Sequence, residues 1–118
     1  AFVINALIET DCVQVLKGQP VRFELPSASG KGQSVMRCPD CGVALWSHYS
    51  NARDAVACVR VGTLDEPERC PPNAHVFTST KQPWVGLPDG VPAFESYYSP
   101  KQQWSPESQR RFLAVKPL

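Results

Sequence analysis

The feature that most constrains this chain is a pair of cysteines, Cys38 and Cys41, within the run Cys-Pro-Asp-Cys-Gly at residues 38–42. Pro39 and Gly42 favour a tight turn, which brings both sulfur atoms within reach of one ion. Zinc prefers four ligands in tetrahedral geometry, with sulfur at about 2.3 Å. The run therefore predicts a zinc knuckle that supplies half of a metal site.

Two other interpretations of the pair stay open: a redox-active dithiol, and turn cysteines that bind nothing. A thioredoxin-like dithiol lies at a helix N-terminus, where the helix dipole lowers the thiol pKa. Residues 43–46 read Val-Ala-Leu-Trp, which is typical of a strand. The chain has five cysteines, and an odd number argues against a closed disulfide framework. The local pattern favours zinc.

Length and charge exclude several broad classes of protein. With 118 residues the chain fits a single domain, 1–118. Its formal net charge is +1 and its basic residues are scattered, so we expect no nucleic-acid partner. It has neither an apolar run near the ~20 residues of a membrane span nor a signal-peptide pattern, so we expect no membrane partner and a cytoplasmic location. Because residue 1 is Ala, we expect at least an initiator Met before it. A homo-oligomer stays open.

The pattern along the chain predicts a mostly β fold. Short runs rich in β-branched residues alternate with turn residues, and most of the 12 prolines lie in the second half, which should be rich in loops. Ser105 and Pro106 are suited to begin a helix at about 106–114. We expect antiparallel sheets joined near the knuckle, less than about one-fifth helix, and strands at residues 2–8, 12–16, 21–25, 33–37, 43–49, 55–61 and 75–79.

Five blocks of sequence resemble the glutathione-dependent formaldehyde-activating (GFA) family, also described as centromere protein V-like, in order and spacing. The resemblance covers about residues 1–95 and leaves 96–118 as a tail with the C-terminal helix. The blocks are residues 38–46, 61–65, 74–78, 82–84 and 87–94, preceded by an opening strand at residues 1–3.

The resemblance implies a β-tent fold with one structural zinc held by four cysteines, of which Cys38 and Cys41 match the later C-x-x-C pair. It implies glutathione as the small-molecule partner and carbon–sulfur lyase chemistry on S-hydroxymethylglutathione-type adducts. In the family a Cys-x-Cys-x-x-Cys block forms the active-site zinc centre. Neither that block nor the family's N-terminal C-x-C occurs in the 118 residues, so no catalytic residue is assigned. We expect little activity from this chain alone.

A few other residues are candidates for a site. His75 and Trp84 are candidates for lining a substrate pocket. Cys70 lies five residues before His75, and these two side chains would complete a Cys₃His zinc site with the knuckle. Of the rest, we expect His48 at the surface, Cys12 and Cys58 as small core side chains, and Trp46, Trp84 and Trp104 mostly as packing anchors.

Three functions therefore remain: a GFA-like enzyme or enzyme remnant, a zinc-stabilised binding module without catalysis, and a reductase resembling the methionine-sulfoxide type. The third requires a nucleophilic cysteine outside the knuckle, a role that would fall to Cys58 or Cys70.

Overall fold

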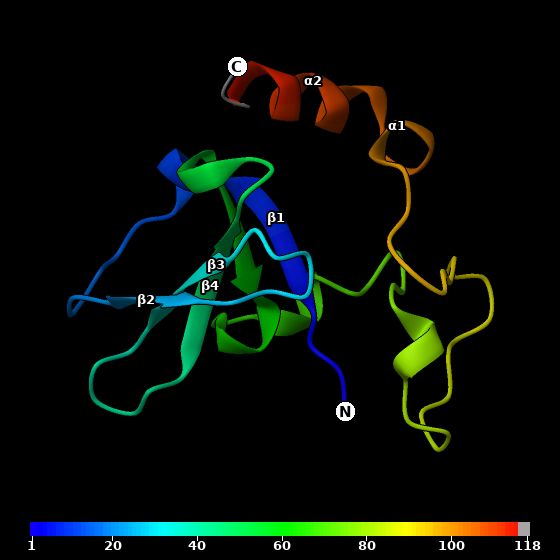
Figure 1. The fold of residues 1–118 in the computed structure, drawn as a ribbon, viewed down its shortest axis with the longest axis horizontal. Helices are drawn as coiled ribbons and strands as arrows, with labels where there is room; N and C mark the ends of the chain where they lie inside the picture. The colour runs from blue at the N-terminus through cyan, green and yellow to red at the C-terminus, as the bar shows by residue number, and fades with distance from the viewer. Residues whose placement is uncertain (116–118) are drawn as a thin grey trace.

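A computed structural model describes residues 1–115 and has one five-stranded antiparallel sheet at its centre (Figure 1). The strand order is β1-β5-β4-β3-β2. The predicted mostly β fold is confirmed. The strands are β1 (Asn5–Glu9), β2 (Val21–Leu25), β3 (Gln33–Arg37), β4 (Ala44–Tyr49) and β5 (Val56–Arg60).

Strands β2 to β5 form a meander, in which each strand pairs with the next one along the chain. The register places one row of side chains on the same face of the sheet across all five strands: Leu7, Cys58, Ser47, Val35 and Phe23. The middle of this row is buried, with Val35 3% and Ser47 0% exposed, whereas Phe23 on β2 is 46% exposed. The core therefore lies over β5, β4 and β3 and thins out toward β2.

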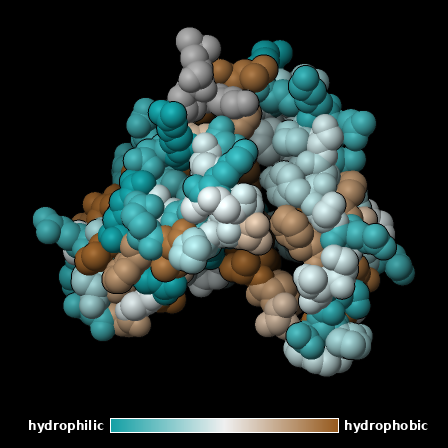
Figure 2. Space-filling view, in the orientation of Figure 1, coloured by the Kyte–Doolittle hydropathy of each residue, from teal (hydrophilic) through white to brown (hydrophobic). Residues whose placement is uncertain are grey.

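A loop-rich layer formed by residues 64–98 lies beside the sheet (Figure 1). Burial raises the pKa of Tyr97, and nearby Tyr98, Cys58 and Tyr49 raise it further, so Tyr97 lies over the face that carries Cys58. The molecule is hollowed between the layer and the sheet, and hydrophobic side chains border the hollow (Figure 2). The sheet and the layer thus form two walls with an opening between them (Figure 2).

The predicted C-terminal helix is present as α2 (Pro106–Val115), which lies at one end of the sheet (Figure 1). The backbone N–H of Ser108 donates to Ser105 Oγ at 3.1 Å, which is the expected N-terminal cap. Arg111 on α2 donates two hydrogen bonds to the carboxylate of Glu9, at 2.7 and 2.5 Å. A short helix that was not predicted, α1 (Pro100–Gln103), precedes it. Neither helix of the described part, with 4 and 10 residues, could span a membrane.

Two predicted strands are wrong. Residues 12–16 form no strand, since the chain makes a 3₁₀ turn at Thr10–Cys12 and then runs exposed, with Leu16 90% exposed and no strand of the described part paired with it. At residues 75–79 only His75 makes a bridge, to Ala93, because Phe77 takes a left-handed conformation with φ 56° and begins a 3₁₀ turn at Thr78–Thr80. In both places a turn replaces the ladder that β-branched residues favour.

Some predictions for single residues are confirmed and others are wrong. Cys58 is buried, as expected, whereas Cys12 is exposed because the strand that would bury it does not form. His48 is 6% exposed rather than at the surface, and Trp84 is 74% exposed rather than a packing anchor. Burial of His48 is tolerated because both ring nitrogens have partners: Trp46 Nε1 donates to Nε2 at 3.1 Å, and Nδ1 lies 2.9 Å from the carbonyl of Val56. Polar neighbours in the sequence gave no sign of these partners.

Candidate metal centre

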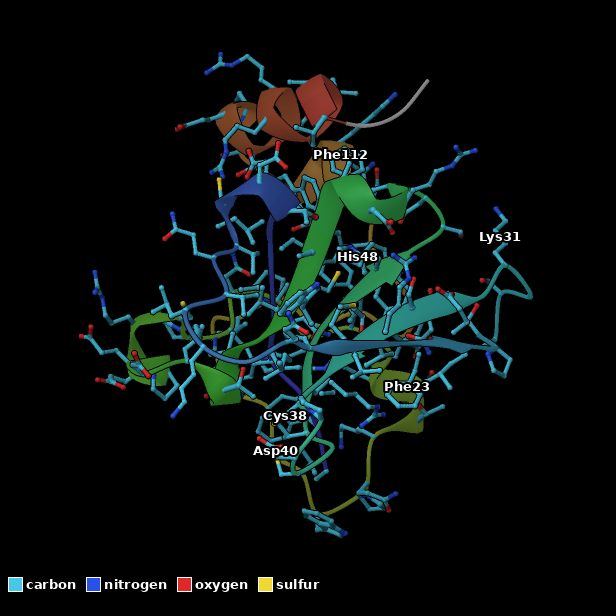
Figure 3. The ribbon with its side chains drawn as sticks, turned by 90° about the vertical axis from the view of Figure 1, so that its left-hand side faces the viewer. Phe23, Lys31, Cys38, Asp40, His48 and Phe112 are labelled. Carbon is cyan, nitrogen blue, oxygen red and sulfur yellow. The ribbon has the colours of Figure 1, made fainter. Side chains whose placement is uncertain are left out.

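The cysteine knuckle forms the turn between β3 and β4, at the end of the sheet opposite α2 (Figure 3). Two backbone hydrogen bonds close the turn: Cys38 N–H donates to the carbonyl of Val43 at 3.0 Å, and Gly42 N–H donates to the carbonyl of Cys38 at 2.9 Å. Gly42 has φ 74°, a left-handed conformation that glycine adopts without strain. The chain therefore reverses tightly around Cys38 and Cys41, as the sequence predicts.

The turn also stabilises negative charge on sulfur. The backbone N–H groups of Cys41 and Asp40 lower the pKa of Cys38, and the thiol of Cys41 lowers it further, whereas desolvation and the nearby Asp40 carboxylate oppose the shift. Thiolate is the form of cysteine that binds metal. Cys38 is half-buried and Cys41 is exposed, so an ion can approach both sulfurs from solvent.

Arg37 is a contributor to the knuckle that sequence reasoning missed. Its Nη1 donates to the carbonyl of Gly42 at 2.8 Å, across the base of the turn. This bond satisfies a carbonyl at the turn and holds the arginine side chain against the turn. The one available signal was an arginine directly before the first cysteine, which by itself is too common to interpret.

Within residues 1–115, no group of three or more His, Cys, Asp or Glu side chains is arranged to hold a metal ion. The knuckle thus supplies two thiols, and the structure does not bring Cys70 and His75 together with them. Cys70 lies half-buried after a 3₁₀ turn at Pro67–Arg69, beside a surface pocket lined by Leu64, Asp65, Glu66, Arg69 and Cys70. The thiols of Cys38 and Cys41 could fill two of the four ligand positions of a tetrahedral zinc ion.

His75 and Trp84 both belong to the layer beside the sheet. The backbone of His75 is fixed, since its N–H donates to Pro92 at 2.8 Å and its carbonyl accepts from Phe94 at 2.9 Å. Its Nε2 is buried and has no hydrogen-bond partner among the described residues. Trp84 extends into solvent. A ring nitrogen with an unused hydrogen-bonding capacity keeps His75 a candidate for contact with a ligand.

We expect Gly42→Ala to destabilise the chain by about 1–2 kcal/mol, since an L-residue is strained at this φ. A Cβ added at Gly42 meets no atom within 4 Å, so the cost comes from the backbone alone. Gly62→Ala is the matched control, because Gly62 is equally open and lacks a positive φ. Urea denaturation of both variants measures the difference. Equal stability of the two variants would contradict the requirement for glycine at position 42.

A sequence model of the family described as "Glutathione-dependent formaldehyde-activating enzyme" matches residues 1–80. This match spans more than half of the 118 residues, and it includes the whole sheet and the cysteine knuckle. The chain belongs to the glutathione-dependent formaldehyde-activating family. No curated protein and no solved structure matches it.

Proposed function

We propose that this chain is a GFA-like enzyme or enzyme remnant that binds zinc through Cys38 and Cys41 and recognises adducts of glutathione with formaldehyde or a related aldehyde. The observation that carries the proposal is the knuckle, in which two backbone N–H groups stabilise the Cys38 thiolate and both sulfurs are accessible. Family membership supplies the substrate class. The reaction would make or break a carbon–sulfur bond.

A zinc ion at the knuckle would contribute positive charge and would tie the β3–β4 turn to further ligands. The chain's own residues have separate roles. Cys38 and Cys41 would hold the ion, Arg37 and Gly42 keep the turn in shape, and the two walls beside the hollow would receive the thiol adduct. We propose that His75, in the layer beside the sheet, contacts the ligand through its Nε2, an atom that is buried and unpaired among the described residues and that a local opening of the layer would expose.

The 118-residue chain by itself should show little or no acceleration of S-hydroxymethylglutathione formation, because it contains no Cys-x-Cys-x-x-Cys block. The measurement is the rate of adduct formation from glutathione and formaldehyde, with and without added zinc, followed by NMR. Wild type and Cys38→Ser should both match the uncatalysed rate. Robust zinc-dependent turnover by wild type would contradict this expectation and would show that other residues build the active centre.

Binding of glutathione tests the substrate class independently of turnover. Titration with S-methylglutathione, a stable analogue of the adduct, should shift NMR signals of His75 and of neighbouring residues in the layer beside the sheet. His75→Ala should reduce these shifts, while His48→Phe serves as the comparison because His48 bonds to Trp46 and Val56 instead. Absence of any shift at high ligand concentration would remove glutathione adducts from the proposal.

A zinc-stabilised binding module without catalysis is the second candidate, and one observation favours it: the 118 residues contain no Cys-x-Cys-x-x-Cys block. Zinc binding together with ligand binding but no turnover would support it. The structure gives less support to a reductase that uses Cys58, since burial raises the pKa of this thiol to about 11 and leaves it protonated at neutral pH.

A further inference from the structure

The edge strand β2 is exposed along its whole length. All five of its residues are exposed, and it lies at the end of the strand order, so within residues 1–115 only β3 pairs with it. Unpaired edges readily accept another strand, and proteins usually protect them with proline, bulges or inward-pointing charge. Here the prolines, Pro20 and Pro26, lie just outside the strand and leave its five residues available.

The sequence of β2, Val-Arg-Phe-Glu-Leu, is complementary to itself when two copies run antiparallel. With a two-fold axis at Phe23, Val21 lies opposite Leu25 of the second copy, and Arg22 lies opposite Glu24 of the second copy. Every directly opposed pair is then apolar with apolar, or cation with anion. Such cross-strand pairs stabilise a sheet, whereas like charges placed opposite each other destabilise it.

The apolar side chains of β2 are exposed on one face of the sheet, where a second β2 strand could contact them. Val21, Phe23 and Leu25 alternate along the strand, so they share the face that carries the row of Val35 and Ser47. All three are exposed, because the core thins out at this edge. A second β2 would extend the same face and would cover part of their surface (Figure 3 places Phe23 on this strand).

The charged side chains are held in position before any partner arrives. Arg22 donates to the Asp54 carboxylate at 2.8 and 3.0 Å, to Glu24 at 2.6 Å and to Ser34 Oγ at 2.6 Å. Asp54 thus fixes the guanidinium on the opposite face from Phe23. The Glu24 side chain is 70% exposed and can turn from its own Arg22 to that of a neighbour.

We propose that β2 is a homodimerisation strand, which pairs antiparallel with β2 of a second copy of this chain and joins two five-stranded sheets into one. Pro20 and Pro26 limit the new ladder to five residues, because proline donates no backbone hydrogen bond. An interface this short is smaller than those of permanent dimers. The association is therefore weak and reversible, and it strengthens with protein concentration.

Charge-swap variants test the pairing. Arg22→Glu places like charges opposite each other in a homodimer, and Glu24→Arg does the same with the opposite sign. Each variant alone should dimerise about tenfold more weakly than wild type, or worse. An equimolar mixture of the two should form heterodimers, and the double variant R22E/E24R should regain homodimers. Sedimentation equilibrium from about 10 µM to 1 mM covers the expected range of affinity.

Arg110→Glu is the matched control, since it makes the same charge change on the exposed part of α2 and should dimerise like wild type. Circular dichroism checks that each variant folds. If Arg22→Glu does not fold without its bond to Asp54, Glu24→Arg and Phe23→Lys carry the test, because both keep that bond and both bring like charges together. A wild-type chain that stays monomeric at 1 mM overturns the proposal. A dimer whose affinity is unchanged in the charge-swap variants also overturns it, because that result would place the interface on another surface.

Discussion

Replacing Cys38 with serine is expected to lower the zinc affinity of the chain by more than about a hundredfold. A serine hydroxyl keeps its proton at neutral pH, so the knuckle loses the thiolate that the N–H groups of Cys41 and Asp40 stabilise. Partners that only orient a metal ligand already contribute ten- to a hundredfold to affinity, and Cys38 would be a ligand itself. Competition with a chromophoric chelator gives the affinity, and elemental analysis gives zinc per chain.

Two cysteine variants provide the controls for this loss. Cys12→Ser removes an exposed thiol of the turn that follows β1, and it should bind zinc like wild type. Cys70→Ser tests whether the loop cysteine completes the site, although the structure does not place it with the knuckle. Equal zinc affinity in wild type and Cys38→Ser would contradict the knuckle as a metal site. A loss in Cys70→Ser as large as that in Cys38→Ser would instead show a rearranged Cys₃His site.

The second large effect is expected for His48→Ala, which should lower the free energy of unfolding by about 2–4 kcal/mol. The substitution leaves a cavity, and it also removes the partners of Trp46 Nε1 and of the Val56 carbonyl. Because Nε2 accepts from Trp46, the ring must carry its proton on Nδ1 and donate it to Val56. This imidazole therefore connects β4 to the start of β5.

His48→Phe separates packing from hydrogen bonding, because it fills the space but pairs with neither polar group. It should still cost about 1–3 kcal/mol, since an unpaired buried polar group is destabilising. His75→Ala, outside the sheet, should cost less than His48→Ala. Urea denaturation of the three variants gives the comparison. A change within about 0.5 kcal/mol for His48→Ala would show that the ring is not a structural connection.

The sequence was most informative where local chemistry decides the structure. At residues 38–42 proline, glycine and the cysteine spacing all act within one turn, and the structure has that turn. Alternation of apolar and polar residues predicted β2 with its correct bounds, and a serine cap followed by proline predicted the start of α2. These signals need no knowledge of distant contacts.

Predictions failed where distant contacts decide. His48 stands among polar residues, yet its burial depends on Val56, which pairs with it only after β4 and β5 come together. Residues 12–16 have strand-like composition, but no neighbouring strand offers them hydrogen bonds. The same limit applies to the metal centre. The spacing of Cys38 and Cys41 identifies this pair as metal ligands, but ligands from distant parts of a sequence cannot be recognised by their spacing.

The most direct test of the account is X-ray absorption spectroscopy at the zinc edge on the zinc-loaded 118-residue chain, compared with the double variant Cys38→Ser/Cys41→Ser. The account predicts at least two sulfur neighbours at about 2.3 Å in the wild type and none at that distance in the double variant. A wild-type spectrum that shows only nitrogen and oxygen neighbours, or one that is unchanged in the double variant, would contradict the claim that this knuckle binds zinc.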